Sequence, residues 1–76
     1  MSEINISQLA GRFAENKDIA RDIRIKQIIP ALGNLEPVIL NFGGVDSVTQ
    51  SFVHALISDL FRLYGSDVLD RLSFKS

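Results

Sequence analysis

Polar side chains with reactive or hydrogen-bonding groups gather in one short loop, between an apolar segment and a long helical pattern. Asp46, Ser47, Thr49, Gln50 and Ser51 all fall between positions 46 and 51. Their ordinary role is to cap the helix, because serine and threonine oxygens accept hydrogen bonds from free backbone N–H groups of the first turn. A hydroxyl here could also carry a phosphate, which the positive end of the helix dipole favours. Both interpretations stay open from the sequence.

Two capping schemes compete within this loop. If Ser47 is the N-cap, Gln50 falls at the third helical position and "SVTQ" forms a capping box. If Thr49 is the N-cap, Val48 and Val53 are spaced as a hydrophobic staple. The two local signals are of similar strength, and either one places the hydroxyl of Ser51 within the first turns.

Other kinds of chemistry find little support in the sequence. The chain has no cysteine and a single histidine, which excludes disulfides, thiolate metal sites and histidine clusters. Ser51 and His54 lie one helical turn apart, but catalysis would also need an orienting acid and an oxyanion site. Gly43 and Gly44 lack the spacing and the lysine of a phosphate-binding loop. We therefore expect no enzymatic activity, no cofactor and no metal.

Charge and hydropathy exclude further classes of protein. The net charge is −1, and 46% of the residues are hydrophobic, as in ordinary globular chains. No apolar run approaches the roughly 20 residues of a membrane span, and the N-terminus does not resemble a signal peptide. We expect a cytoplasmic protein that binds neither membrane nor nucleic acid. Basic side chains of the N-terminal half alternate with Asp18 and Asp22, which favours an ion-paired surface: Arg12, Lys17, Arg21, Arg24 and Lys26.

The elements that must position the loop follow from hydrophobic periodicity. Residues 3–7 alternate and predict a short strand, and Gly11 marks a turn followed by irregular chain. Asn16 is a good N-cap for a helix whose apolar pattern runs on until Pro30. Because proline removes a backbone donor, we expect that helix to end or kink at this residue.

The second half of the chain begins with the best strand of the sequence. Residues 37–42 are almost continuously apolar, as in a strand buried on both faces. A broad apolar face then predicts one helix over residues 50–64, with Gly65 as its C-terminal glycine. A cap at Ser66 or Asp67 begins another short helical turn, and the final residues begin a strand.

These elements predict a single α/β domain over residues 1–76, with a small sheet and helices. A right-handed crossover would make the first two main strands parallel. The last strand would leave an unpaired edge, so we expect the chain to be cut short at its C-terminus or completed by a partner. If the chain ends at Ser76 in nature, we expect it not to be a monomer. Seven side chains should form the core: Ile23, Val38, Leu40, Phe42, Phe52, Leu56 and Leu60.

The segment "EPVILNFGGVDSVTQSFVHALISDLFRLYG" resembles a STAS-like bacterial domain of unknown function, the DUF4325 type, through its strand, its loop and its "SF" helix start. "RFAENKDIARDIR" resembles that family's N-terminal helix and "SDVLDRLSFKS" its continuation, so the resemblance covers most of the chain. The family pattern has aspartate where this chain has Asn41, and it usually continues beyond the present C-terminus.

STAS domains include the anti-sigma factor antagonists, and this relation in fold implies a role. In those proteins a histidine-kinase-like ATPase phosphorylates a serine or threonine at the helix start, and the charge switches partner binding. The resemblance places Thr49, Gln50 and Ser51 in that region, although the "DSSG" motif is absent.

We therefore expect a non-enzymatic regulatory module that binds a protein partner through loop 45–51 and helix 50–64, with or without a phosphorylation switch. The alternative is a phage- or mobile-element-type accessory subunit whose open sheet edge is completed by a partner chain or by self-association as a homo-oligomer.

Overall fold

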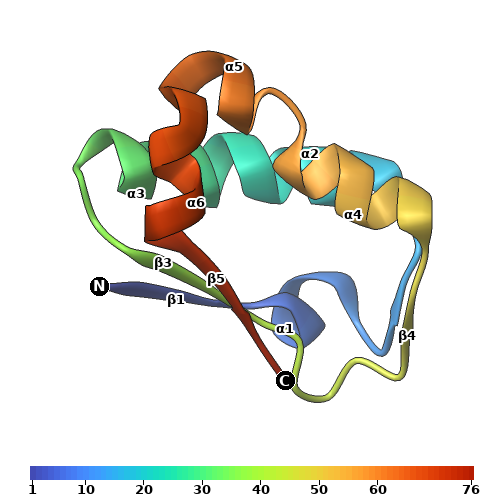
Figure 1. Ribbon diagram of the computed structural model, residues 1–76. Helices are drawn as coiled ribbons and strands as arrows, with labels where there is room; N and C mark the ends of the chain where they lie inside the picture. The colour runs from blue at the N-terminus through green and yellow to red at the C-terminus, as the bar shows by residue number, and fades with distance from the viewer.

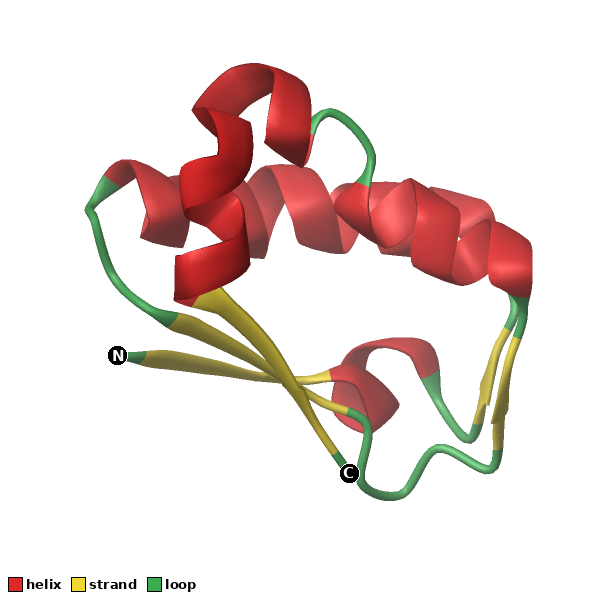
Figure 2. Ribbon diagram, in the orientation of Figure 1, coloured by secondary structure: helices red, strands yellow, loops and turns green.

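The computed structural model describes all residues from Met1 to Ser76. A three-stranded sheet lies on one side of the molecule and most of the helices on the other (Figures 1 and 2). In chain order the elements are β1 (Ser2–Asn5), α1 (Ile6–Ala10), β2 (Phe13–Ala14), α2 (Lys17–Ile23), the π-helical segment η1 (Arg24–Ile28), α3 (Ile29–Gly33), β3 (Val38–Asn41), β4 (Ser47–Val48), α4 (Gln50–Ile57), α5 (Leu60–Tyr64), the 3-10 turn η2 (Gly65–Asp67), α6 (Val68–Arg71) and β5 (Leu72–Lys75).

The main sheet is parallel, with β3 between β1 and β5. The predicted α/β class and the parallel pairing of the first two main strands are confirmed, as is the final strand. The prediction that β3 is buried on both faces is wrong. Val38 and Leu40 are fully buried, but Ile39 and Asn41 on the opposite face are only half-buried. Helices cover one face, so side-chain alternation makes every second residue face away from the core.

The N-terminal segment contains more regular structure than its sequence predicts. Ile6 does not extend the first strand; it begins helix α1, although its side chain is fully buried. Two apolar residues at spacing two cannot distinguish the end of a strand from a turn into a helix. Gly11 ends α1 with a φ of 81°, and the residues after it form the short strand β2 rather than irregular chain.

Asn16 caps α2 as predicted, because its side-chain oxygen accepts the N–H of Asp18 at 2.8 Å. The helical path does not end at Pro30 but continues to Gly33 through the π-helical segment η1. There the N–H of Ile29 donates to the carbonyl of Arg24, five residues earlier. This wider π-helical turn is the distortion of the helix near Pro30. It lies just before the proline, which cannot donate a backbone hydrogen bond.

The predicted single helix over residues 50–64 is wrong. It breaks at Ser58 and at Asp59, which adopts the left-handed conformation with a φ of 68°. The guanidinium of Arg24 donates to the carbonyl of Ala55 at 2.6 Å and to the hydroxyl of Ser58, so it supplies partners at the end of α4. Arg62 donates to the carboxylate of Asp59 at 3.3 Å, which lowers the pKa of that aspartate.

Helices α2 and α4 pack against each other, and the core lies between the helices and the sheet. All 14 buried residues are hydrophobic. Six of the seven predicted core side chains are among them. Phe42 is half-buried instead and stacks on Phe74, with ring centroids 6.2 Å apart. Gly65 ends α5 as predicted, but neither Ser66 nor Asp67 caps the next helix with its side chain.

Candidate functional site

The polar loop is held by a second, two-stranded parallel sheet. Strand β2 pairs with β4, placing Phe13 beside Ser47 and Ala14 beside Val48. The N–H of Asp46 also donates to the carbonyl of Arg12 at 2.7 Å. Because β2 leads into α2 and β4 leads into α4, the pairing brings the starts of these helices to the same end of the molecule (Figure 2).

Each predicted residue of the loop has a distinct role in this arrangement. The carboxylate of Asp46 accepts the Nε–H of Arg12 at 2.8 Å, so it fastens the loop to the segment before β2. Ser47 lies in β4 with an exposed side chain, and the capping box that it would begin is not formed. Thr49 is the N-cap, since its hydroxyl accepts the N–H of Phe52 at 3.1 Å. The competition between the two capping schemes is therefore decided in favour of Thr49.

Ser51 is the accessible hydroxyl at the start of α4. Its side chain is exposed, and its oxygen lies 3.2 Å from the hydroxyl of Thr49. Together with Gln50 it lines a shallow depression of about 470 Å³ that also includes Lys17, His54 and Ala55. The loop thus presents a hydroxyl, an amide and a lysine on one surface, beside the backbone N–H groups of a helix start.

Ser51 and His54 face the same depression, but no hydrogen bond joins their side chains. The nearest hydrogen-bond partner of the Ser51 hydroxyl is Thr49, which already serves as the cap. Ser51 and His54 therefore do not form the hydrogen-bonded pair that a nucleophile and its base would make.

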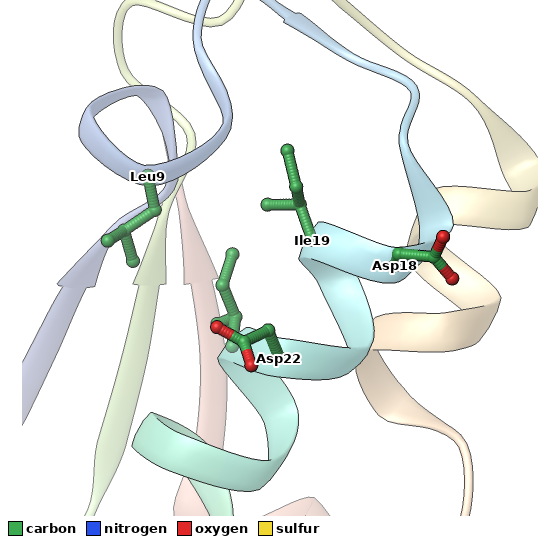
Figure 3. Close-up of a pocket in the computed structure, with 5 residues that line it drawn as sticks. Leu9, Asp18, Ile19 and Asp22 are labelled. Atoms are coloured by element: carbon green, nitrogen blue, oxygen red, sulfur yellow. The ribbon is translucent and has the colours of Figure 1, made fainter.

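A second hollow, of about 320 Å³, lies between α1 and α2 (Figure 3). Leu9 and Ile19 contribute apolar side chains to it, while the carboxylates of Asp18 and Asp22 point in different directions. Asp22 is instead paired with Lys26 at 3.1 Å. No group of three or more His, Asp or Glu side chains that could hold a metal ion occurs in the molecule.

A third hollow, which the sequence analysis does not predict, is lined only by apolar side chains. It has a volume of about 170 Å³ and lies beside the edge strand β5. Three of its side chains are largely exposed: Phe61 at 50%, Leu69 at 67% and Phe74 at 56%. The apolar face predicted for a single helix over residues 50–64 includes Phe61, but the helix breaks after α4, and Phe61 lies on α5 instead. The remaining lining residues are Ile57, Leu60, Val68 and Leu72.

Parallel strands, helices on one face of the main sheet and a hydroxyl-bearing helix start define a small α/β domain. No helix in this structure combines the length and the apolar character needed to span a bilayer. The family described as STAS-like domain of unknown function (DUF4325) matches residues 19–76, and the chain belongs to that family. Comparisons with curated proteins and with solved structures give no match.

Proposed function

We propose that this chain is a non-enzymatic regulatory module that binds a protein partner through loop 45–51 and helix α4. The observation that carries the proposal is the exposed hydroxyl of Ser51, presented at a helix start on a loop that is fixed at several points. Membership of a STAS-like family supports a regulatory or interaction role. The surface is ordered before binding, so little conformational entropy would be lost when a partner docks.

Phosphorylation of this loop is the regulatory step that we propose, with a histidine-kinase-like ATPase as the class of kinase. Ser51 is the better acceptor, because Thr49 is half-buried and its hydroxyl already accepts the N–H of Phe52. A phosphate on Ser51 would add about 1.5 to 2 negative charges beside the α4 start, near Lys17. The free fold tolerates an anion there, whereas a partner surface built for a neutral hydroxyl does not.

The test replaces Ser51 or Thr49 with aspartate. Thr49→Asp keeps a good N-cap, and Ser51→Asp places a carboxylate in the first turn, so the melting temperature should change little. Partner binding should weaken tenfold or more, which corresponds to about 1.4 kcal/mol. Binding partners would be captured from the native organism, identified by mass spectrometry together with the phosphosite, and purified for measurement of Kd.

Ser66→Asp is the matched control, because Ser66 is an exposed serine outside the loop. It should leave both the melting temperature and the partner affinity unchanged. If Ser51→Asp and Thr49→Asp bind the purified partner as tightly as the wild-type chain does, the switch is refuted and Thr49 is a cap only. If either variant unfolds, the assignment of these hydroxyls to an accessible surface is wrong.

A second candidate function is favoured by a different observation, the apolar hollow beside β5. An accessory subunit whose open sheet edge is completed by another chain would need such a surface, because strand addition combines backbone hydrogen bonds with side-chain pockets. Contact at the β5 edge, rather than at the loop, separates this candidate from the first.

A further inference from the structure

Helices α2 and α4 run parallel to each other and are in contact at both ends. Because β2 pairs with β4 and each strand leads into one of these helices, the two helices start side by side. At the other end, the guanidinium of Arg24, which directly follows α2, donates to the carbonyl of Ala55 at 2.6 Å and to the hydroxyl of Ser58. A cation of one helix thus meets a serine hydroxyl of the other.

The same combination of residue types occurs at the start of the helix pair. Lys17 precedes Arg24 by seven residues, and Ser51 precedes Ser58 by seven residues. Seven residues are nearly two helical turns, so each residue lies on the same helix face as its later counterpart. Lys17 and Ser51 are therefore expected across the helix pair from each other, and both line the depression of about 470 Å³.

Lys17 is the free cation of this depression. Its side chain is exposed and makes no ion pair within the chain. The other titratable side chain of the depression is His54, on α4 itself, and no carboxylate lines it. Asp18 instead lines the hollow between α1 and α2, and Asp46 is held by Arg12. The ammonium of Lys17 is thus available to an anion that forms on α4.

We propose that Lys17 is the intramolecular receptor of a phosphate on Ser51, so that phosphorylation ties the start of α4 to the start of α2. The ammonium is a compact charge on a flexible stem and reaches the phosphate without movement of either helix. The resulting hydrogen bonds are charge-assisted, and the phosphate occupies the depression. This inference rests on the proposed phosphorylation of Ser51 and adds a residue outside loop 45–51 to the switch.

The experiment measures the pKa of the phosphate by phosphorus NMR, in a chain that carries phosphoserine at position 51. The second pKa of free phosphoserine is about 6, and a neighbouring cation lowers it by favouring the dianion. Every chain also carries His54→Gln, because histidine changes charge in the same pH range. In this background Lys17→Gln should raise the pKa of the phosphate by about 0.3 or more, the order expected for loss of one exposed ion pair.

Two further substitutions of Lys17 give the sign and the specificity of the effect. Lys17→Glu should raise the pKa of the phosphate beyond the value in Lys17→Gln, since a carboxylate disfavours the dianion. Lys17→Arg keeps the positive charge and should keep the low pKa. An arginine variant that behaves like the glutamine variant would overturn the proposal, because the charge at position 17 would then not be what the phosphate senses.

Arg21→Gln is the matched control, because Arg21 is also an exposed cation of α2 without an ion pair but does not line the depression. It should leave the pKa of the phosphate unchanged. A phosphoserine at position 66 is the second control, since Ser66 is exposed and lies outside the loop. The pKa of that phosphate should not respond to Lys17→Gln.

Equal effects of Lys17→Gln and Arg21→Gln, or no effect of either, would overturn the proposal, because the phosphate would then sense only the overall charge of the chain. Loss of the helical circular dichroism spectrum on phosphorylation would overturn it as well, because α2 and α4 would then not accommodate the phosphate. The phosphate is installed during synthesis of the chain, so the titration needs neither kinase nor partner. The Kd measurements of the proposed switch can therefore fail while this inference holds, and the reverse.

Discussion

The side chains of Glu3, Asn41 and Lys75 connect the three main strands. Its amide nitrogen donates to the carboxylate of Glu3 at 2.8 Å, and its oxygen accepts the N–H of Gly43 at 2.8 Å. The same carboxylate oxygen of Glu3 lies 3.7 Å from the ammonium of Lys75. A carboxylate at position 41 would face Glu3 without a proton to donate, so the amide belongs to the network.

Asn41→Asp should therefore lower the free energy of unfolding by about 1 kcal/mol at neutral pH, since it replaces one hydrogen bond with two neighbouring carboxylates. Urea denaturation measures the change. The matched control is the double variant Glu3→Gln with Asn41→Asp, in which the new amide can donate to the new carboxylate. It should recover most of the loss. A single variant as stable as the wild-type chain would mean that the Asn41–Glu3 bond contributes nothing.

Helix ends are where the elements of this chain depart from ordinary sequence preferences. The end of α3 is a Schellman motif: the N–H of Glu36 donates to the carbonyl of Ala31 at 3.1 Å, and the N–H of Leu35 donates to that of Leu32 at 3.0 Å. The residue in the left-handed conformation is Leu35, with a φ of 62°, at the position that glycine usually occupies. Its side chain is 77% exposed, so packing does not offset the strain.

Leu35→Gly should raise the free energy of unfolding by about 0.5 to 1 kcal/mol, because glycine adopts a positive φ without the clash of a Cβ atom. Thermal or urea denaturation would measure the gain. Leu35→Ala is the control, since it shortens the exposed side chain but keeps the Cβ atom. A gain in the alanine variant equal to that of the glycine variant would show that side-chain exposure, rather than backbone strain, limits stability at this turn.

At the scale of the whole molecule, stability depends on one small core. Fourteen buried hydrophobic residues lie between the helices and the sheet. Leu56 is fully buried on α4, the helix that starts at the candidate site and packs against α2. A domain of this size has a total stability of roughly 0.05–0.15 kcal/mol per residue, so the loss of one large core side chain is a sizeable part of it.

Leu56→Ala should cost about 2–5 kcal/mol, from lost burial and the cavity left behind. Leu63→Ala, at a side chain that is 48% exposed on α5, is the control and should stay within about 0.5 kcal/mol of the wild-type chain. Urea denaturation of both variants measures the difference. A cost below about 0.5 kcal/mol for Leu56→Ala would mean that α4 does not pack on the core through this face.

The sequence by itself determined the features that depend on neighbouring residues. The side chain of Asn16 caps α2, and Gly65 ends α5, because each acts on backbone groups within a few positions. The alternating segments also determined the α/β class and the parallel pairing of β1 with β3. Hydrophobic period and crossover handedness require only local pattern and chirality.

Tertiary structure decided what depends on residues far apart in the chain. Ser47 and Thr49 were equal candidates for the cap until β4 paired with β2, more than thirty residues earlier, and took Ser47 into a strand. The break after α4 depends on Arg24, whose guanidinium reaches Ser58 from another helix. The packing of the elements also decided that helices cover only one face of β3. It likewise placed β5 at the edge of the sheet. Such contacts have no period in the sequence, because their partners meet only after the chain has closed long loops.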